Sequence, residues 1–161
     1  MNRKSIYLIF TITLFSTLVF NLTGFAQSNS IDAGLRIGSS RAVIGSAITA
    51  RYYTDNYTSI QAIIGFSGQG GMGAMLEKHV DLDFEPAKLR AFGGAGAYIG
   101  FGERDVIGAQ GVAGLEYYLD EYPVSVSFDW KPELNIISRV KFRAGVIGLT
   151  FRYRLNWQTG Q

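Results

Sequence analysis

The sequence predicts an all-β fold, specifically an eight-stranded, antiparallel, up-and-down transmembrane β-barrel. Three observations support this prediction. Apolar residues alternate with polar or small residues over many segments after Ala26, which is the period of a β-strand. Clusters rich in turn-forming residues separate these segments. Most of the segments reach the roughly 9 to 11 residues that a tilted strand needs to cross a bilayer.

The beginning of the chain has the layout of a secretory signal peptide. Two basic residues precede an apolar run over 6–20, and Gly24 and Ala26 then supply the small residues that a signal peptidase requires. The alternative is an uncleaved membrane anchor, because the longer run over 6–26 approaches the roughly 20 residues that span a hydrocarbon core. We therefore expect a cleaved signal peptide over 1–26 and a barrel domain over 27–161.

The charge balance argues against a nucleic-acid-binding protein. The chain has 15 Lys and Arg residues against 13 Asp and Glu residues, but Arg3 and Lys4 belong to the predicted signal peptide. Without these two, the basic residues equal the acidic ones, so no basic excess is left to attract a phosphate backbone. The chain has one His and no Cys, so we expect neither a transition-metal site nor a cofactor.

The first four strands are expected over 31–39, about 43–54, about 60–66 and about 74–82. Their apolar faces are Ile31, Ala33, Leu35 and Ile37, then Ile44, Ile48, Ala50 and Tyr52, then Ile60, Ala62, Ile64 and Phe66. Asp55 and Asn56 form the turn between the second strand and the third. In the fourth strand, the parity that turns Glu77 and His79 inward sends Lys78 outward. A lipid-facing Lys costs about 2 to 4 kcal/mol at the bilayer midplane, so we expect a bulge or a snorkelling side chain there.

The last four strands are expected over 89–101, 108–119, 124–131 and 143–155. The seventh is the clearest, because Val124, Val126, Phe128 and Trp130 alternate with Ser125, Ser127, Asp129 and Lys131. The parity of the fifth strand is ambiguous. Gly93, Ala95 and Ala97 form a weak lipid-facing series, which would turn Phe92 and Tyr98 inward.

Charged residues of both signs fall on the face opposite the apolar series, together with many glycines. A small barrel has an interior just wide enough for side chains, so glycines beside long side chains make room for them. The pattern therefore predicts a polar lumen filled by a charge network, and a barrel closed to ions. The expected members of this network are Arg36, Arg51, Glu77, Arg90, Glu116, Asp129 and Arg152.

Aromatic residues are expected to form two girdles around an apolar exterior, as in membrane barrels. If the chain begins on the periplasmic side, one girdle is periplasmic and the other is external. The periplasmic girdle consists of Tyr52, Tyr117 and Tyr153, and the external girdle of Phe66, Phe101 and Trp130. The expected external loops, around 39–41, 68–73, 102–106 and 132–140, are short.

Several motifs resemble those of small outer-membrane β-barrel proteins common in Bacteroidota, within the OmpA/OmpX-like class of eight-stranded barrels. The motifs are the run 114–118, Pro123 with 128–133, the run 92–101 and the final 148–153. The resemblance implies an integral protein of a Gram-negative outer membrane, in contact with outer-membrane lipid and with the outer-membrane insertion machinery. It specifies a barrel and no reaction, and we expect a monomer.

Three functions are compatible with this pattern. We favour a membrane-embedded structural or interaction protein that is not an enzyme. The first alternative is an outer-membrane lipid-modifying enzyme, in which His79 would act with a cross-strand Ser59 or Ser67. The second is a secreted, lipocalin-like carrier of an apolar ligand, which would need its apolar face turned inward. Alternation by itself does not distinguish the inside of a barrel from the outside.

Overall fold

The computed structural model describes residues 30–84, 87–102, 105–119, 122–137 and 140–155. The predicted signal peptide lies outside these residues. The described strands are β1 (Ile31–Gly38), β2 (Ala47–Tyr53), β3 (Thr58–Gly65), β4 (Gly71–Phe84), β5 (Ala87–Gly100), β6 (Val106–Tyr118), β7 (Val124–Trp130), β8 (Glu133–Asn135), β9 (Lys141–Arg143) and β10 (Ile147–Leu155). Among these residues, we find no helix whose length and hydropathy would let it span a membrane.

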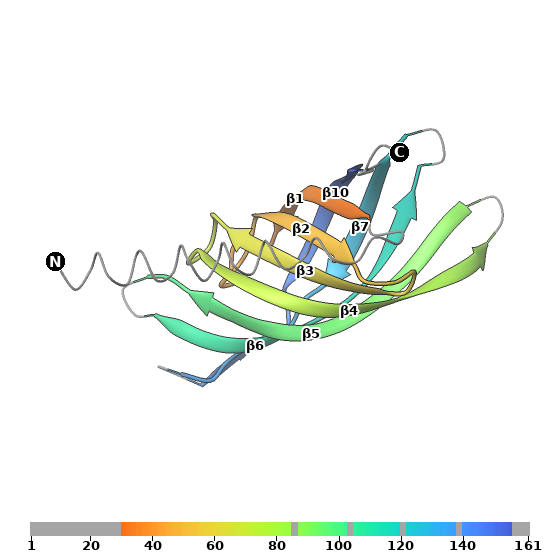
Figure 1. Ribbon diagram of the computed structural model, residues 1–161. Helices are drawn as coiled ribbons and strands as arrows, with labels where there is room; N and C mark the ends of the chain where they lie inside the picture. Colours follow the sequence, from red (N-terminus) through yellow and green to blue (C-terminus); the bar gives the residue numbers. More distant parts are fainter. Residues whose placement is uncertain (1–29, 85–86, 103–104, 120–121, 138–139, 156–161) are drawn as a thin grey trace, which may run out of the picture.

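These strands form a closed barrel (Figure 1). Each of β1 to β6 pairs antiparallel with the next strand, β7 pairs with β10, and the ladder between β1 and β10 closes the ring. β8 and β9 form a short hairpin that continues the sheet from the beginning of β6. The predicted all-β, eight-stranded antiparallel barrel is therefore confirmed.

The barrel has two ends, which we name by the path of β1. The N-terminal end is where β1 begins, and it includes Ile31, its partner Leu155 and the turn over 54–57. The predicted turn at Asp55 is present, because the Asp55 carboxylate accepts a hydrogen bond from the Tyr57 N–H (2.8 Å). This bond lowers the pKa of the Asp55 carboxyl below its usual range. The loop end is where β1 finishes, beside the loop over 39–46.

Successive side chains point to opposite sides of each strand, and the barrel turns the two sides into an interior and an exterior. Along β10, for example, buried and exposed side chains alternate strictly from Ile147 to Tyr153. The buried positions of the barrel are mostly polar or charged, and the exposed ones carry large apolar side chains. The ambiguous parity of β5 is resolved as well, because Phe92 and Tyr98 are buried inside while Ala95 and Ala97 are exposed outside.

The prediction that Ile44 faces outward in the second strand is wrong. β2 begins only at Ala47, and the preceding loop folds into the barrel, so that Val43 and Ile44 are completely buried. These two residues belong to an apolar cluster that fills the loop end of the lumen. We call this cluster the apolar plug, and it consists of Val43, Ile44, Ala47, Ile63, Tyr98 and Val106. Ile44 and Ile48 have the even spacing of one strand face, and this spacing does not reveal that the backbone leaves the barrel wall before Ala47.

The seventh and eighth strands are also shorter than predicted. β7 ends at Trp130 because Pro132 has no N–H for a ladder, and the Pro132 carbonyl instead accepts a hydrogen bond from Gly111. Within the segment expected to be an external loop over 132–140, residues Glu133–Asn135 form β8. The segment predicted as one strand over 143–155 is divided by residues 144–146 into β9 and β10.

Lys78 faces outward as its parity requires, but no bulge accompanies it. β4 keeps its register with β3 and β5 through Lys78, which pairs with Thr58 on one side and Gly93 on the other. The ammonium group donates a hydrogen bond to the Thr58 hydroxyl (2.8 Å). The side chain therefore turns toward the N-terminal end, where β3 begins.

Candidate functional site

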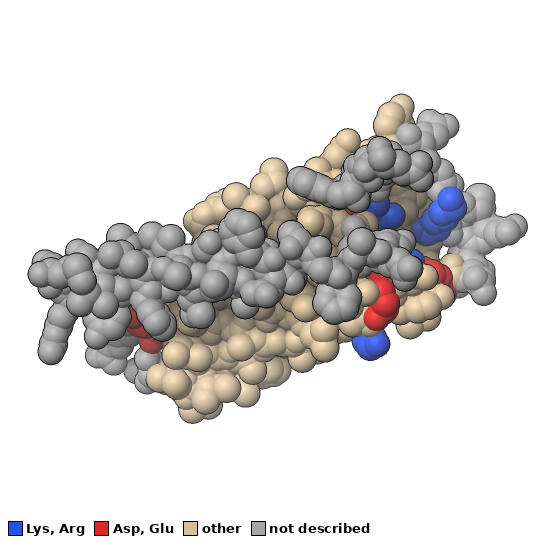
Figure 2. Space-filling model, in the orientation of Figure 1, with Lys and Arg blue, Asp and Glu red and all other residues tan. Residues whose placement is uncertain are grey.

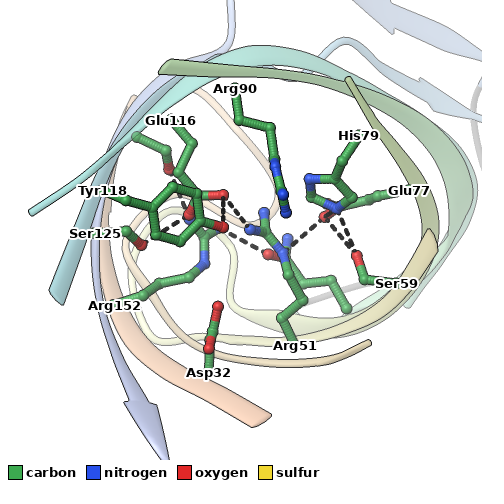
Figure 3. A network of polar contacts seen from close by, with 12 residues as sticks. Asp32, Arg51, Ser59, Glu77, His79, Arg90, Glu116, Tyr118, Ser125 and Arg152 are labelled. Atoms are coloured by element: carbon green, nitrogen blue, oxygen red, sulfur yellow. Dashed lines mark hydrogen bonds and ion pairs between the residues drawn. The ribbon is translucent and has the colours of Figure 1, made fainter. Parts of the chain in front are cut away.

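The polar lumen is centred on Arg51, which the alternation of β2 turns inward (Figure 3). Its guanidinium lies between two carboxylates from opposite parts of the wall. Nε is 2.9 Å from Glu77 Oε2 on β4, and Nη1 is 2.8 Å from Glu116 Oε2 on β6. All three side chains are completely buried, so each charge depends on the others to replace the water it has lost.

Glu116 accepts hydrogen bonds from several further side chains near Arg51. Its carboxylate accepts hydrogen bonds from Arg152 (3.2 Å), the Ser125 hydroxyl (2.8 Å) and the Tyr118 hydroxyl (2.9 Å). Arg152 in turn donates to the Ser127 hydroxyl (2.6 Å) and to the Gln61 side-chain carbonyl (2.8 Å). The network thereby connects strands on all sides of the lumen.

A second group of charges lies toward the loop end. Arg36 Nη2 is 2.5 Å from Asp129 Oδ1, and Arg36 Nη1 donates to the Gly45 carbonyl (3.0 Å). Lys131 pairs with Glu133 (2.8 Å), whose carboxylate also accepts the Val43 N–H (2.7 Å). The sequence placed Lys131 inside but did not identify Glu133, which fell in an expected loop. The sequence does contain a signal for Glu133. Inward-facing residues recur at every second position through Ser127, Asp129 and Lys131, and the next position in this series is Glu133.

A third group lies at the N-terminal end, and it includes Arg90. The ion pair of Arg90 is with Asp81 (2.5 Å), whose side chain is 53% exposed, and thus at the margin of the lumen. Arg90 and Arg154 both lie against the Tyr118 ring, with guanidinium-to-centroid distances of 5.4 and 4.8 Å. Arg154 also pairs with the buried Asp32 (3.2 Å). The seven expected network residues are therefore distributed over three groups.

The six aromatic residues expected in girdles lie on the exterior, close to the ends of their strands. Tyr52, Tyr117 and Tyr153 are near the N-terminal end, and Phe66, Phe101 and Trp130 are near the loop end. Five of them are exposed, and Tyr52 is half-buried. Charged side chains on the described surface in Figure 2 appear toward the ends of the barrel, and the wall between them is nearly free of them.

His79 lies against Ser59 rather than Ser67. The Ser59 Oγ is 2.8 Å from His79 Nε2, whereas the Ser67 hydroxyl accepts the Ser46 N–H (2.6 Å) at the loop end. Glu77 Oε2 is 3.9 Å from the same Nε2 of His79. In a Ser-His-acid triad, the acid holds the other ring nitrogen, Nδ1. Here Nδ1 has no hydrogen-bond partner among the described residues, and the Ser59 and His79 side chains are buried.

The described residues contain no group of three or more His, Cys, Asp or Glu side chains placed to hold a metal ion. Comparison with models of known families, with curated protein sequences and with solved structures found no match.

Proposed function

We propose that this chain is an integral outer-membrane β-barrel protein of a Gram-negative bacterium, with a sealed lumen and a structural or interaction role. The observation that carries the proposal is the inverted distribution of side chains. Arg51, Glu77 and Glu116 are completely buried in the interior. On the exterior, Leu35 is 58% exposed and Phe66 is 66% exposed, and many other large apolar residues accompany them.

Water is an unfavourable surrounding for this exterior. Apolar surface costs about 25 cal/mol per Å² in water, and soluble monomers rarely expose contiguous apolar patches above a few hundred Å². Here the apolar positions recur on every strand around the barrel, so the patch is a continuous band. Lipid removes this cost, and the closed ladder leaves no unpaired strand edge within the band. Aromatic residues near both ends match the two interfaces of a bilayer.

The other two functions fit the geometry less well. A carrier of an apolar ligand needs an apolar cavity, whereas the middle of this lumen is occupied by paired charges. A lipid-modifying enzyme has one observation in its favour, the contact between Ser59 and His79. Its nucleophile would be completely buried and its acid would lie beside the wrong ring nitrogen. The resemblance to outer-membrane barrels is in agreement with the structural role.

The test is a charge placed on the exterior at mid-height. Leu35 lies in the middle of β1, between outward-facing Ile48 and Phe151 on the neighbouring strands. In a bilayer, Leu35→Arg should cost about 2 to 4 kcal/mol and lower the amount of folded protein in the outer-membrane fraction. Tyr122→Arg, in an exposed turn beyond β6, is the control and should change little.

The alternative predicts the opposite result. If the barrel is soluble, Leu35→Arg replaces an exposed apolar side chain by a charged one, and both stability and solubility should be kept or improved. Recovery of the wild type as a soluble periplasmic protein without detergent would also reject the proposal. An intact mass that begins at Gln27 is expected for the exported protein, because Gly24 and Ala26 precede that position.

A further inference from the structure

The β8–β9 hairpin projects at the loop end of the barrel, beside the beginning of β6 (Figure 1). Both strands of the wall that lead into it are interrupted. β7 ends at Trp130 before β8 begins at Glu133, and residues 144–146 separate β9 from β10. The hairpin is therefore a distinct part of the sheet, and it pairs with the barrel through β6.

The inner face of the hairpin is polar and is held by residues of the lumen. The Asn135 side-chain carbonyl accepts hydrogen bonds from the Tyr98 hydroxyl (2.5 Å) and from Arg143 (2.8 Å). Glu133, two residues earlier on β8, is completely buried and pairs with Lys131 (2.8 Å). These contacts fix the hairpin from one side.

The outer face of the same hairpin is apolar and exposed. Leu134 and Phe142 are cross-strand partners, and Ala109 of β6 lies beside Leu134 in the ladder. We call this surface the apolar face of the hairpin, and its side chains are between 38% and 77% exposed: Leu134, Ile136, Val140 and Phe142. It continues the apolar exterior of the barrel beyond the girdle residue Trp130, where a strictly transmembrane wall would end.

A second copy of the chain is a poor cover for this face. Apolar patches of this kind measure about 300 to 600 Å², whereas a stable dimer buries about 800 Å² on each partner. Among the described residues, β9 pairs only with β8, so its other edge is open. Two-fold antiparallel pairing of two such edges about Phe142 would oppose Lys141 of one copy to Arg143 of the other, and like charges in opposed positions are destabilising.

Lipid at the membrane surface fits the hairpin better. Amphipathic segments at a membrane surface bury their apolar face at the boundary between head groups and acyl chains, and their polar face is rich in Lys and Arg. The hairpin has the same division, because alternation along β9 places Phe142 on one face and Lys141 and Arg143 on the other. Through Ala109, its apolar face is also continuous with the exterior of β6.

We propose that the β8–β9 hairpin is an interfacial anchor, whose apolar face inserts into the lipid leaflet around the loop end while Lys141 stays among the head groups. The contacts of Asn135 and Glu133 hold the inner face to the barrel, and lipid covers the outer face. The anchor thereby fixes the depth of the loop end in the leaflet. This proposal rests on the proposed membrane-spanning function and adds a lipid contact beyond the transmembrane wall.

The anchor is tested by spin labels in phospholipid vesicles. The chain has no cysteine, so Phe142→Cys and Lys141→Cys each accept a single nitroxide label. These two neighbours lie on opposite faces and form a matched pair. Electron paramagnetic resonance then measures collisions of the label with oxygen, which concentrates in lipid, and with a water-soluble nickel chelate. The ratio of oxygen to nickel collisions should be several-fold higher at Phe142→Cys than at Lys141→Cys.

A third label, at Phe128→Cys on the exterior of β7, reports the membrane-spanning function in the same vesicles. An oxygen-rich result at Phe128→Cys together with nickel access at Phe142→Cys overturns the anchor and leaves the membrane function standing. A Phe142→Cys label that is shielded from both reagents assigns the face to a protein cover, such as a second copy, and also overturns the anchor. Nickel access at Phe128→Cys rejects the membrane function, and the anchor with it.

A second experiment removes the apolar face and follows a label at Ile136→Cys. With Leu134→Ser and Phe142→Ser combined, this label should move from the oxygen-rich to the nickel-accessible environment. Lys141→Ser is the matched control on the polar face, and it should leave the label in lipid. Gel migration before boiling checks that each variant still forms the barrel. A label that stays in lipid after both apolar residues are replaced would show that the barrel alone sets the position of the hairpin, and it would overturn the anchor.

Discussion

The Glu116 carboxylate holds the centre of the lumen together, because four side chains from four strands donate to it. Two of the donors are guanidinium groups, Arg51 and Arg152. Two positive charges brought this close repel each other unless the carboxylate lies between them. Both are buried, so water does not screen the repulsion. The stability of the barrel should therefore depend on this single acidic residue more than on any acidic residue at the margin.

We predict that Glu116→Ala lowers the free energy of unfolding by about 3 to 5 kcal/mol, since it leaves two buried cations without their shared partner. The matched control is Asp81→Ala, which removes the acidic partner of a half-exposed ion pair and should cost about 0 to 1 kcal/mol. Urea unfolding of both variants in the same detergent measures the difference. Equal losses would mean that the lumen is solvated throughout and that the buried network does not exist as described.

Strand parity predicts which charged residues point inward, but it does not predict their partners. Arg51 and Glu116 were both expected inside, yet they belong to β2 and β6, which never pair. Their contact depends on the diameter of the barrel and on the stagger of the strands, and a single sequence contains neither. Arg90 illustrates the same limit. Its inward direction was predicted correctly, but its ion-pair partner was not. That partner is Asp81, which lies two residues beyond His79 on the inward face of β4.

Among the strands, β5 shows how glycine adapts a wall to a narrow interior. Inward glycines lie where neighbouring backbone comes close. A Cβ added to Gly96 would overlap the carbonyl oxygen of Ala74 on β4. Outward glycines of the same strand have more room, since a Cβ on Gly93 would meet nothing closer than the Val112 carbonyl at 3.6 Å. On this strand, the outer, convex side of the wall has room for a side chain at a glycine position, whereas the inner, concave side does not.

We predict that Gly96→Ala destabilises the barrel by about 1 to 3 kcal/mol, because a carbonyl of the barrel wall must move to admit the methyl group. Gly93→Ala, three residues away on the same strand and on the exterior, should be nearly neutral or slightly stabilising. The two variants are compared by the temperature at which the folded form disappears on gels of unboiled samples. A neutral Gly96→Ala would show that β5 is less tightly curved than described.

Elements with strong alternation were predicted within a few residues, and the errors have identifiable causes. β10 and β7 alternate between clearly apolar and clearly polar residues, which fixes their faces. In the loop over 43–46, the even spacing of Ile44 and Ile48 suggests a shared strand face, but Ile44 is buried in the plug instead of lying on the outer surface. Pro132 was a visible signal that β7 should end, since proline removes a ladder donor. The return of the chain as β9 had no such signal.

For the whole molecule, the barrel presents two unlike ends. The N-terminal end contains Tyr118 with Arg90 and Arg154 against its ring, and the polar lumen begins there. The loop end is filled by the plug. A path for ions has to pass both the paired charges and the apolar constriction. We therefore predict that the wild-type protein shows no stable unitary conductance in planar bilayers, as the filled interior of an eight-stranded barrel implies. Reproducible current steps whose frequency increases with added protein would contradict a sealed barrel.

Under the proposed membrane function, the same asymmetry predicts the orientation of the barrel in the outer membrane. An even number of strands brings both ends of the described chain, Ser30 and Leu155, to the N-terminal end. Membrane barrels have short periplasmic turns and longer external loops. The turn over 54–57 at the N-terminal end is shorter than the loop over 39–46 at the other end. We therefore expect the N-terminal end to face the periplasm and the plugged end to face the outside of the cell.

The absence of cysteine makes this orientation directly measurable, because any introduced thiol is the only one in the protein. Arg41→Cys places a thiol at an exposed position of the loop end, and Asn56→Cys places one at an exposed position of the opposite turn. A membrane-impermeant maleimide should label Arg41→Cys in intact cells, and it should label Asn56→Cys only after the outer membrane is made permeable. The reverse pattern would invert the orientation. Labelling of neither variant in intact cells, with labelling of both after permeabilisation, would place the whole barrel in the periplasm, where its apolar exterior would need a different covering.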